Sequence, residues 1–155
     1  MLRITMLIFL LVSNMALGGE LPNELFKIQL MSNITSLDGE VSKGKGIVRI
    51  KGVPYRYYSI DNKHYTTNGL FQNILVQAKE DGGEISSVIG QSQVEKNDCL
   101  QSIDNYRGII EKQYAIKFPE RNSNPYYLLI EDNKLLMLAC EIKKQSLFKL
   151  ILAKA

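Results

Sequence analysis

The sequence has a single histidine, His64, and it lies among residues that could support acid–base chemistry. Asp61 precedes it by three positions, and Ser59, Thr66 and Thr67 supply hydroxyl groups nearby. A hydrolase that uses histidine as general base needs a nucleophile within reach and a group that orients the ring. Because hydroxyl groups occur in any loop, this pattern predicts only a weaker alternative, a small secreted hydrolase that uses His64.

No catalytic or metal-binding motif strengthens that alternative. The sequence contains no GxSxG, HExxH or P-loop pattern, and two cysteines with one histidine are a poor zinc set. The acidic pairs Asp38/Glu40 and Glu131/Asp132 fall in expected turns, where carboxylates are solvated. We therefore expect no enzyme activity, no cofactor and no metal site.

The two cysteines, Cys99 and Cys140, favour a disulfide bond. In an oxidising compartment an even number of cysteines usually pairs, and two cysteines allow one intramolecular connectivity. The bond would close a loop of about 42 residues and contribute about 4 kcal/mol in the chain-entropy model. Two buried free thiols are the alternative, and the spacing excludes a catalytic CxxC arrangement.

Residues 1–18 have the pattern of a secretory signal peptide. Arg3 supplies the positive start, residues 4–12 (ITMLIFLLV) are apolar, and residues 16–18 (ALG) place small side chains where a signal peptidase acts. The apolar run is shorter than the roughly 20 residues of a membrane-spanning helix. A buried N-terminal strand or an uncleaved anchor is the alternative. We expect a bacterial periplasmic or secreted protein, with no stable membrane insertion after signal cleavage.

Residues 19–155 predict a single α+β domain. The full chain of 155 residues is 45% hydrophobic and 23% charged, with a formal net charge of +3. This composition is typical of a globular domain and not of a disordered or nucleic-acid-binding tail. We therefore expect no nucleic-acid partner.

One long amphipathic helix is predicted at about residues 93–117. Apolar residues recur every three to five positions along one stripe, and charged residues take the other sides. The stripe comprises Val94, Cys99, Ile103, Tyr106, Ile110 and Tyr114. Ser92, with Glu95 three residues later, predicts a capping box at the start of the helix, and Phe118-Pro119 predicts its end.

The half of the chain before this helix is rich in predicted strands. Residues 26–31 alternate apolar and polar side chains as a half-buried strand does, and residues 37–46 carry the glycines of a turn region. Residues 70–79 and 84–89 flank a glycine-containing turn and predict a hairpin. A short helix at residues 70–79 is the alternative.

The half after the helix predicts a three-stranded meander. Residues 126–130 and 135–140 form a hairpin through Asp132-Asn133, and residues 146–153 add a third strand. These runs are nearly continuously apolar, which predicts burial on both faces. The helix would cover one face, and the N-terminal strands or a partner chain would cover the other.

The fold we expect is a curved antiparallel sheet packed around the long helix and tied by one disulfide. The helix should face the C-terminal strands through its apolar stripe. The expected contacts join Ile103, Tyr106 and Ile110 to Leu128, Leu136, Leu138 and Leu150.

The strongest binding candidate is the segment of residues 43–65, where basic and aromatic residues interleave. Within it, residues 46–60 predict one long strand broken by a bulge, or a tight hairpin, near a sheet edge that tolerates Pro54. Arginine and tyrosine often anchor interfaces. The candidate contact residues are Arg49, Lys51, Tyr55, Arg56, Tyr57 and His64. A bulge at residues 52–54 would have to shift the strand phase to bring all six to one face, and a solvated edge strand is the alternative.

These features favour a binding protein. The first expectation is an exported protein-binding domain, such as an inhibitor or immunity protein against a toxin or hydrolase, whose partner presents an acidic surface patch. The alternative is a structural accessory subunit of an envelope, secretion or pilus assembly that joins its neighbours through sheet edges. A carrier of a small ligand is a third, weaker hypothesis. A homo-oligomer is compatible with all three functions.

Overall fold

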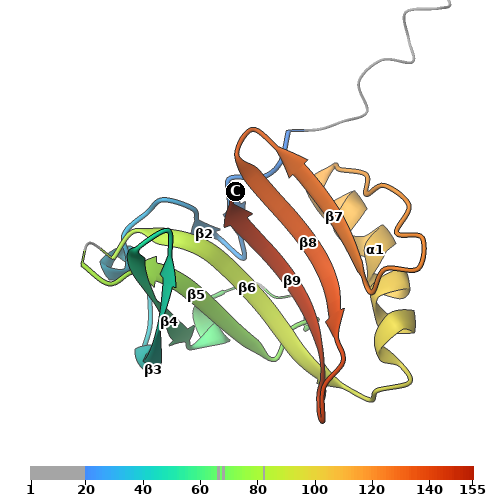
Figure 1. The fold of residues 1–155 in the computed structure, drawn as a ribbon, viewed down its shortest axis with the longest axis horizontal. Helices are drawn as coiled ribbons and strands as arrows, with labels where there is room; N and C mark the ends of the chain where they lie inside the picture. The colour runs from blue at the N-terminus through green and yellow to red at the C-terminus, as the bar shows by residue number, and fades with distance from the viewer. Residues whose placement is uncertain (1–19, 66, 68, 82) are drawn as a thin grey trace, which may run out of the picture.

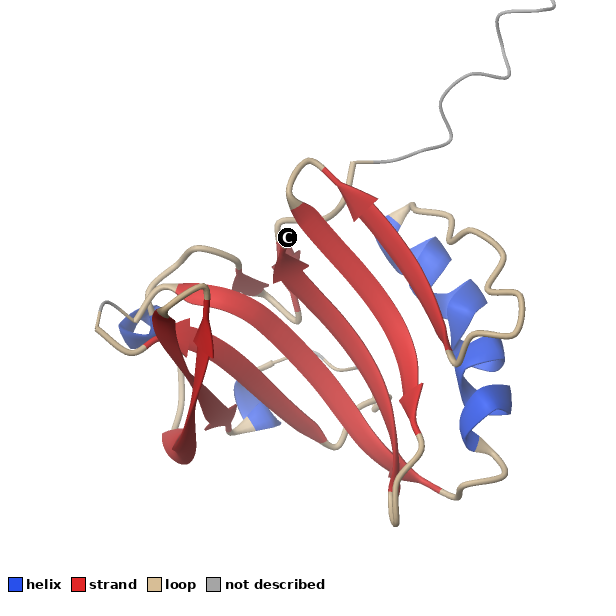
Figure 2. Cartoon of the chain, in the orientation of Figure 1, coloured by secondary structure: helices blue, strands red, loops and turns tan. Residues whose placement is uncertain are grey.

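The computed structural model describes residues 20–65, 67, 69–81 and 83–155. The expected signal peptide at residues 1–18 therefore lies outside the described residues. Within them, the chain is mostly antiparallel sheet with one α-helix, so the α+β prediction is confirmed (Figure 2). The elements are β1 (Glu24–Leu25), β2 (Ile28–Gln29), η1 (Ile34–Ser36), β3 (Val41–Ile50), β4 (Val53–Ile60), η2 (Asn62–His64), β5 (Asn73–Lys79), β6 (Ile85–Val94), α1 (Cys99–Tyr114), β7 (Tyr126–Glu131), β8 (Lys134–Glu141) and β9 (Ser146–Lys154).

Seven strands form one sheet in the order β3-β4-β5-β6-β9-β8-β7. Strands β3 to β6 follow one another as one meander, strands β7 to β9 form a second, and the pairing of β6 with β9 joins the two (Figure 1). The predicted C-terminal meander is therefore confirmed. Its first turn contains Asp132 and Asn133 at φ 46° and 63°, the left-handed backbone that a two-residue hairpin turn requires.

The helix α1 begins later than predicted. Ser92 and Val94 belong to β6, where they pair with Phe148 and Ser146 of β9. The backbone of this segment forms its hydrogen bonds with β9. Val94 is therefore part of a strand and does not belong to the apolar stripe of the helix. The predicted capping box at Ser92 is wrong. Asp98 is the N-cap, and its side chain makes no capping hydrogen bond.

The helix also ends earlier than Phe118-Pro119. Ala115 takes a left-handed conformation at φ 53° and ψ 40°, and its N–H donates to the Glu111 carbonyl. Such a residue closes a helix by satisfying one of its last free carbonyls. Among the residues that the structure describes, no helix is both long and apolar enough to cross a membrane.

The N-terminal segment forms a tight pair of strands and not the single strand predicted at residues 26–31. Phe26 and Lys27 lie at φ 57° and 68° and turn the chain between β1 and β2. The Phe26 ring is buried, with its centroid 5.3 Å from that of Phe71, and a Cβ atom at Gly90 would lie 2.4 Å from Phe26 Cζ. Burial of the ring offsets the strained turn. The predicted turn region at residues 37–46 is also wrong in its second half, because β3 begins at Val41.

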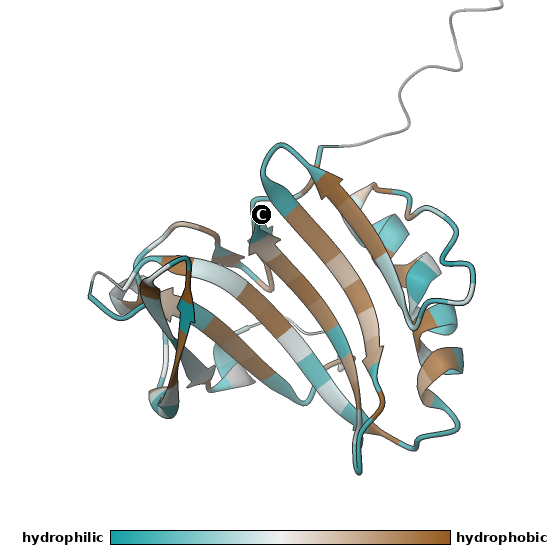
Figure 3. Ribbon diagram, in the orientation of Figure 1, coloured by the Kyte–Doolittle hydropathy of each residue, from teal (hydrophilic) through white to brown (hydrophobic). Residues whose placement is uncertain are grey.

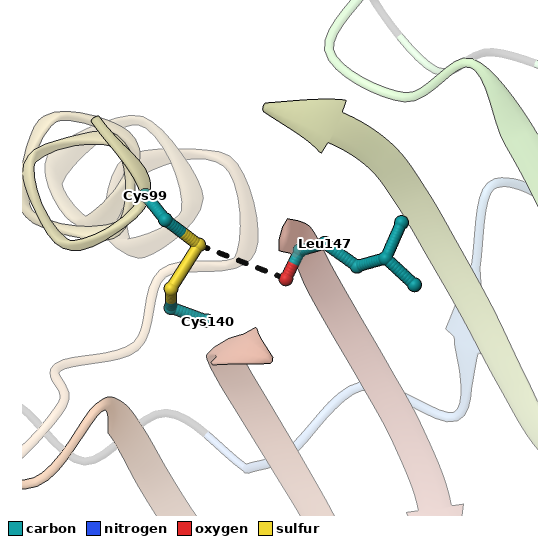
Figure 4. The surroundings of a disulfide bond; sticks show 3 residues. All are labelled: Cys99, Cys140 and Leu147. Atoms are coloured by element: carbon teal, nitrogen blue, oxygen red, sulfur yellow. Dashed lines mark hydrogen bonds between the residues drawn. A yellow bond between two sulfur atoms is a disulfide. The ribbon is translucent and has the colours of Figure 1, made fainter. Parts of the chain in front are cut away.

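Cys99 and Cys140 form the predicted disulfide bond. Their Cα atoms lie 5.7 Å apart, within the usual 4.4–6.8 Å range. The bond ties the first residue of α1 to β8, and the Leu147 carbonyl oxygen lies 3.8 Å from the Cys99 sulfur (Figure 4). A disulfide sulfur carries no hydrogen to donate, so this approach is a van der Waals contact.

The buried face of α1 packs as expected in most of its contacts. Ile103 and Ile110 are fully buried in one core with Leu136, Leu138 and Leu150. Tyr106 is half-buried, with its ring centroid 4.8 Å from that of Phe148. Leu128 is the exception, and its predicted contact is wrong.

The register of β7 with β8 explains that exception. Tyr127 and Leu129 lie opposite the buried Leu138 and Leu136 and take the core side. Leu128 lies between them, so it points to the other face of the sheet.

The prediction that both faces of the C-terminal strands are buried is also wrong. Buried and half-buried residues alternate along β8 and β9. We use "covered face" for the side that carries Leu136, Leu138 and Leu150 and packs against α1. We use "open face" for the opposite side, which carries the half-buried Met137 and Ile151. Apolar residues predominate along β7, β8 and β9, whereas polar residues interrupt them along β5 and β6 (Figure 3).

Candidate functional site

The β3–β4 hairpin carries five of the six candidate contact residues and forms one end of the sheet (Figure 1). Lys51 and Gly52 form its turn at φ 49° and 83°, so the tight-hairpin alternative is confirmed. The irregularity in the register lies between Lys43 and Ile47, so the predicted bulge at residues 52–54 is wrong. Within the described residues, the outer edge of β3 pairs with no other strand.

The register separates the candidate residues between two faces. Residues directly opposite each other on paired strands share a face. Arg49 lies opposite Pro54, which puts Arg49 on the same face as Arg56. Tyr55 and Tyr57 lie on the other face, and Lys51 lies in the turn. The six residues therefore do not form one continuous patch on a single face.

Arg56 is engaged within the protein. Its Nε and Nη2 atoms donate to the two Glu80 carboxylate oxygens at 2.6 and 2.8 Å, and Nη1 donates to the Gly44 carbonyl at 2.6 Å. The Arg56 hydrogen bonds, with a further one from Lys43, lower the pKa of Glu80 to about 2. Arg56 thus ties the hairpin to the residue that follows β5. All three guanidinium nitrogens of Arg56 therefore bond within the protein.

Three other cations of the hairpin are exposed and unpaired. Among the described residues, no ion pair involves Lys45, Arg49 or Lys51. Large apolar side chains are exposed between them. These are Ile47 (49%), Val48 (41%), Ile50 (44%) and Tyr57 (38%). The hairpin therefore combines free positive charge with exposed apolar surface.

A cavity of about 280 Å³ adjoins the turn of this hairpin on the open face. The ion pair between Lys79 and Glu84, 2.9 Å long, forms part of its wall. The lining residues are Ile50, Lys51, Val53, Tyr55, Gln77, Lys79, Glu84, Ser86, Ala153, Lys154 and Ala155. Lys51 and Tyr55 thus line the same concave surface, which runs from the hairpin to Ala153 of β9.

His64 lies apart from the strands, exposed in η2. Its ring rests against Gly39, where a Cβ atom would lie 2.6 Å from His64 Cδ2. The Asp61 carboxylate accepts the N–H of Lys63 at 3.1 Å. Within the described residues, no hydroxyl or carboxylate group forms a hydrogen bond with His64, and no cluster of residues has the composition of a metal site.

Reasoning from the sequence missed the apolar ladder on the open face. Five half-buried side chains lie opposite one another across five neighbouring strands of the sheet. They are Leu75, Ile89, Ile151, Met137 and Leu128. The signal was the alternation of apolar residues within each strand, but assigning those residues to a face requires the strand register.

No protein-family model, curated protein or solved structure matches this chain.

Proposed function

We propose that the chain is an exported protein-binding domain that contacts its partner through the β3–β4 hairpin. The observation that carries this proposal is the set of unpaired cations beside exposed apolar residues at a free sheet edge. Arg49 and Lys51 flank Ile50 in the sequence, and Val48 is exposed on the same face of the hairpin as Ile50. Contiguous apolar surface rimmed by polar groups is typical of protein contact sites.

The charge of the hairpin supports a partner with an acidic surface patch. Lys45, Arg49 and Lys51 have no carboxylate partner among the described residues. An acidic surface would supply one, and the resulting attraction would speed association at low ionic strength. An inhibitor or immunity protein against a toxin or hydrolase fits this description, because a small domain with a charged contact surface can occlude an active site.

Export is supported by two features. The pattern of residues 1–18 is that of a signal peptide. The bond between Cys99 and Cys140 is of the kind that persists in oxidising compartments. We therefore place the mature protein in the periplasm or outside the cell.

The free edge of β3 supports a second candidate function, a structural accessory subunit of an envelope, secretion or pilus assembly. An edge strand can join neighbouring subunits through main-chain pairing. Stoichiometry distinguishes the two. An inhibitor or immunity protein forms a complex of one copy with one partner and abolishes the partner's activity, whereas an accessory subunit is recovered in an assembly of many copies.

The test begins with a photo-crosslinking amino acid at Val48, in the organism that makes the protein. The matched control places it at Ile142, which has similar exposure at 47% but lies outside the hairpin. A protein that is crosslinked from position 48 but not from position 142 is identified as the partner. Its affinity is then measured for the protein and for the Arg49→Glu/Lys51→Glu variant, after circular dichroism has shown an intact fold.

We expect the charge reversal to weaken binding at least tenfold, and rising salt to slow association of the unaltered protein. The control variant, Lys96→Glu/Lys144→Glu, makes the same change of charge at exposed lysines elsewhere and should bind normally. Equal affinity of both variants would contradict the assignment of the contact surface to the hairpin.

A further inference from the structure

The outer edge of β3 offers main-chain hydrogen-bonding groups. A two-residue turn closes on a hydrogen-bonded pair, here Ile50 with Val53, and the next pair, Arg49 with Pro54, is not hydrogen-bonded. Proline has no N–H, which suits that position. The backbone groups of Ile47 and Arg49 therefore point away from β4. Within the described residues, no backbone group outside the sheet ladders bonds to them.

The side chains of the hairpin differ in chemistry between its faces. Arg49 lies on one face, with Lys43, Arg56 and the exposed Ile47. Because Glu80 pairs with both Lys43 and Arg56, Arg49 is, among the described residues, the cation of this face that is open to a carboxylate. Val48 and Ile50 lie on the other face, with Tyr55 and Tyr57. A segment that pairs with the outer edge of β3 would place its own side chains alternately on these two faces. Carboxylates on the first face and apolar side chains on the second would complement both.

The charge of β3 disfavours a second copy of the chain at this edge. The strand contains three basic residues and no acidic one. Antiparallel pairing of two copies would bring these cations together, and like charges at facing positions destabilise a sheet. An acidic segment meets no such repulsion.

From these features we infer the binding mode of the partner. An extended segment of alternating acidic and apolar residues adds as a strand to the outer edge of β3. This inference rests on the proposed function and deepens it, because it names both the chemistry of the partner and the main-chain groups that hold it. Peptides bind other proteins in this way when an exposed sheet edge supplies the affinity and side-chain contacts supply the specificity.

The regular part of the edge sets the register. The irregularity between Lys43 and Ile47 interrupts the ladder, which leaves residues 47–50 as the straight portion. A carboxylate of the added strand would therefore face Arg49. No atom lies within 4 Å of a Cβ atom built at Gly46, so the approach to the start of this portion is open.

The first experiment uses the oxidised protein and a peptide of five Glu-Val repeats with blocked ends as the probe. Binding is followed by fluorescence anisotropy at low salt, with a peptide of five Lys-Val repeats as the control. We expect the Glu-Val peptide to bind at least tenfold more tightly. In the complex, the amide hydrogens of Ile47 and Arg49 should become protected from exchange, whereas those of Val48 and Ile50, already bonded to β4, should change little.

The second experiment compares Ile47→Pro with Ile47→Ala. Both variants remove the isoleucine side chain, but only proline also removes the N–H that points outward. Edge strands tolerate proline at such a position. We expect Ile47→Pro to bind the Glu-Val peptide at least tenfold more weakly than Ile47→Ala. Should the proline variant fail to fold, the amide protection pattern of the unaltered protein decides the question by itself.

The outcomes separate this inference from the function on which it rests. If Ile47→Pro binds like Ile47→Ala and the Ile47 and Arg49 amides gain no protection, strand addition is wrong. If Arg49→Glu/Lys51→Glu still weakens binding of the crosslinked partner in that case, the hairpin remains the contact surface. Unchanged binding in both variants would overturn the two proposals together.

Discussion

Reduction of the Cys99–Cys140 bond should lower the free energy of unfolding by about 4 kcal/mol. The cysteines are separated by 41 positions, and the chain-entropy model gives about this value for a loop of that length. With a urea dependence of about 2 kcal/mol per molar, the unfolding midpoint should fall by about 2 M. Most of the effect arises in the unfolded chain, because the bond limits its freedom.

The effect on the folded state should concentrate at the start of α1. The Asp98 side chain makes no capping hydrogen bond, so the disulfide restrains the first turn where no side-chain cap does. The far end is held separately, since Arg107 bonds to Glu111 at 2.9 Å and the Glu111 carboxylate accepts the N–H of Phe118 at 2.8 Å. Amide exchange in the reduced protein should therefore speed up near Cys99 more than near Glu111.

Urea denaturation with and without a thiol reductant measures this difference, with far-ultraviolet circular dichroism as the readout. The Cys99→Ala/Cys140→Ala variant is the control, and the reductant should leave its midpoint unchanged. A midpoint shift below about 0.5 M for the unaltered protein, at an unchanged slope, would refute the reasoning.

Three further predictions concern packing and pH. Ile110→Ala should lower the free energy of unfolding by about 2–5 kcal/mol, because the side chain is 1% exposed. Ile109→Ala, at a position 46% exposed, should change it by less than about 0.5 kcal/mol in the same denaturation experiment. Hydrogen bonds from Arg56 lower the pKa of Glu80 from 4.5 to about 2. The stability that this pair supplies is therefore present above about pH 4.5 and lost as the pH falls toward 2, and Glu80→Gln should remove that part of the acid dependence in pH-dependent urea titrations. Burial raises the pKa of Tyr114 from 10 to about 12. Stability should therefore fall as the pH rises from 10 to 12, and Tyr114→Phe should reduce that fall, with tyrosinate absorbance as an independent readout.

Local sequence signals predicted the features that depend on a few adjacent residues. The turn at Asp132-Asn133 followed from residues that tolerate positive φ. The disulfide followed from the even number of cysteines and the expected export. The errors have a different origin, because Ser92 and Val94 fit a helix pattern as well as a strand pattern. Only their pairing with β9, more than fifty residues along the chain, decides between the two.

The sequence indicated the hairpin that carries the candidate contact residues, but not how those residues are arranged in it. The basic and aromatic residues that alternate along this segment are visible in the sequence itself. The assignment of Arg49 and Tyr55 to opposite faces depends on the strand register. The engagement of Arg56 by Glu80 depends on the neighbouring β5 strand. The strand register and the contact between Arg56 and Glu80 both belong to the tertiary structure, and no local sequence pattern predicts them.

The position of the disulfide has a consequence for the rate of folding. Each meander can form from neighbouring segments, but the seam between β6 and β9 joins Val94 to Ser146 and requires closure of a long loop. Such non-local closure slows folding. Cys99 lies just after the end of β6, and Cys140 just before the start of β9. Once the bond has formed, the covalent path across the seam is short. A chain oxidised before it folds should therefore complete the sheet faster than a reduced chain.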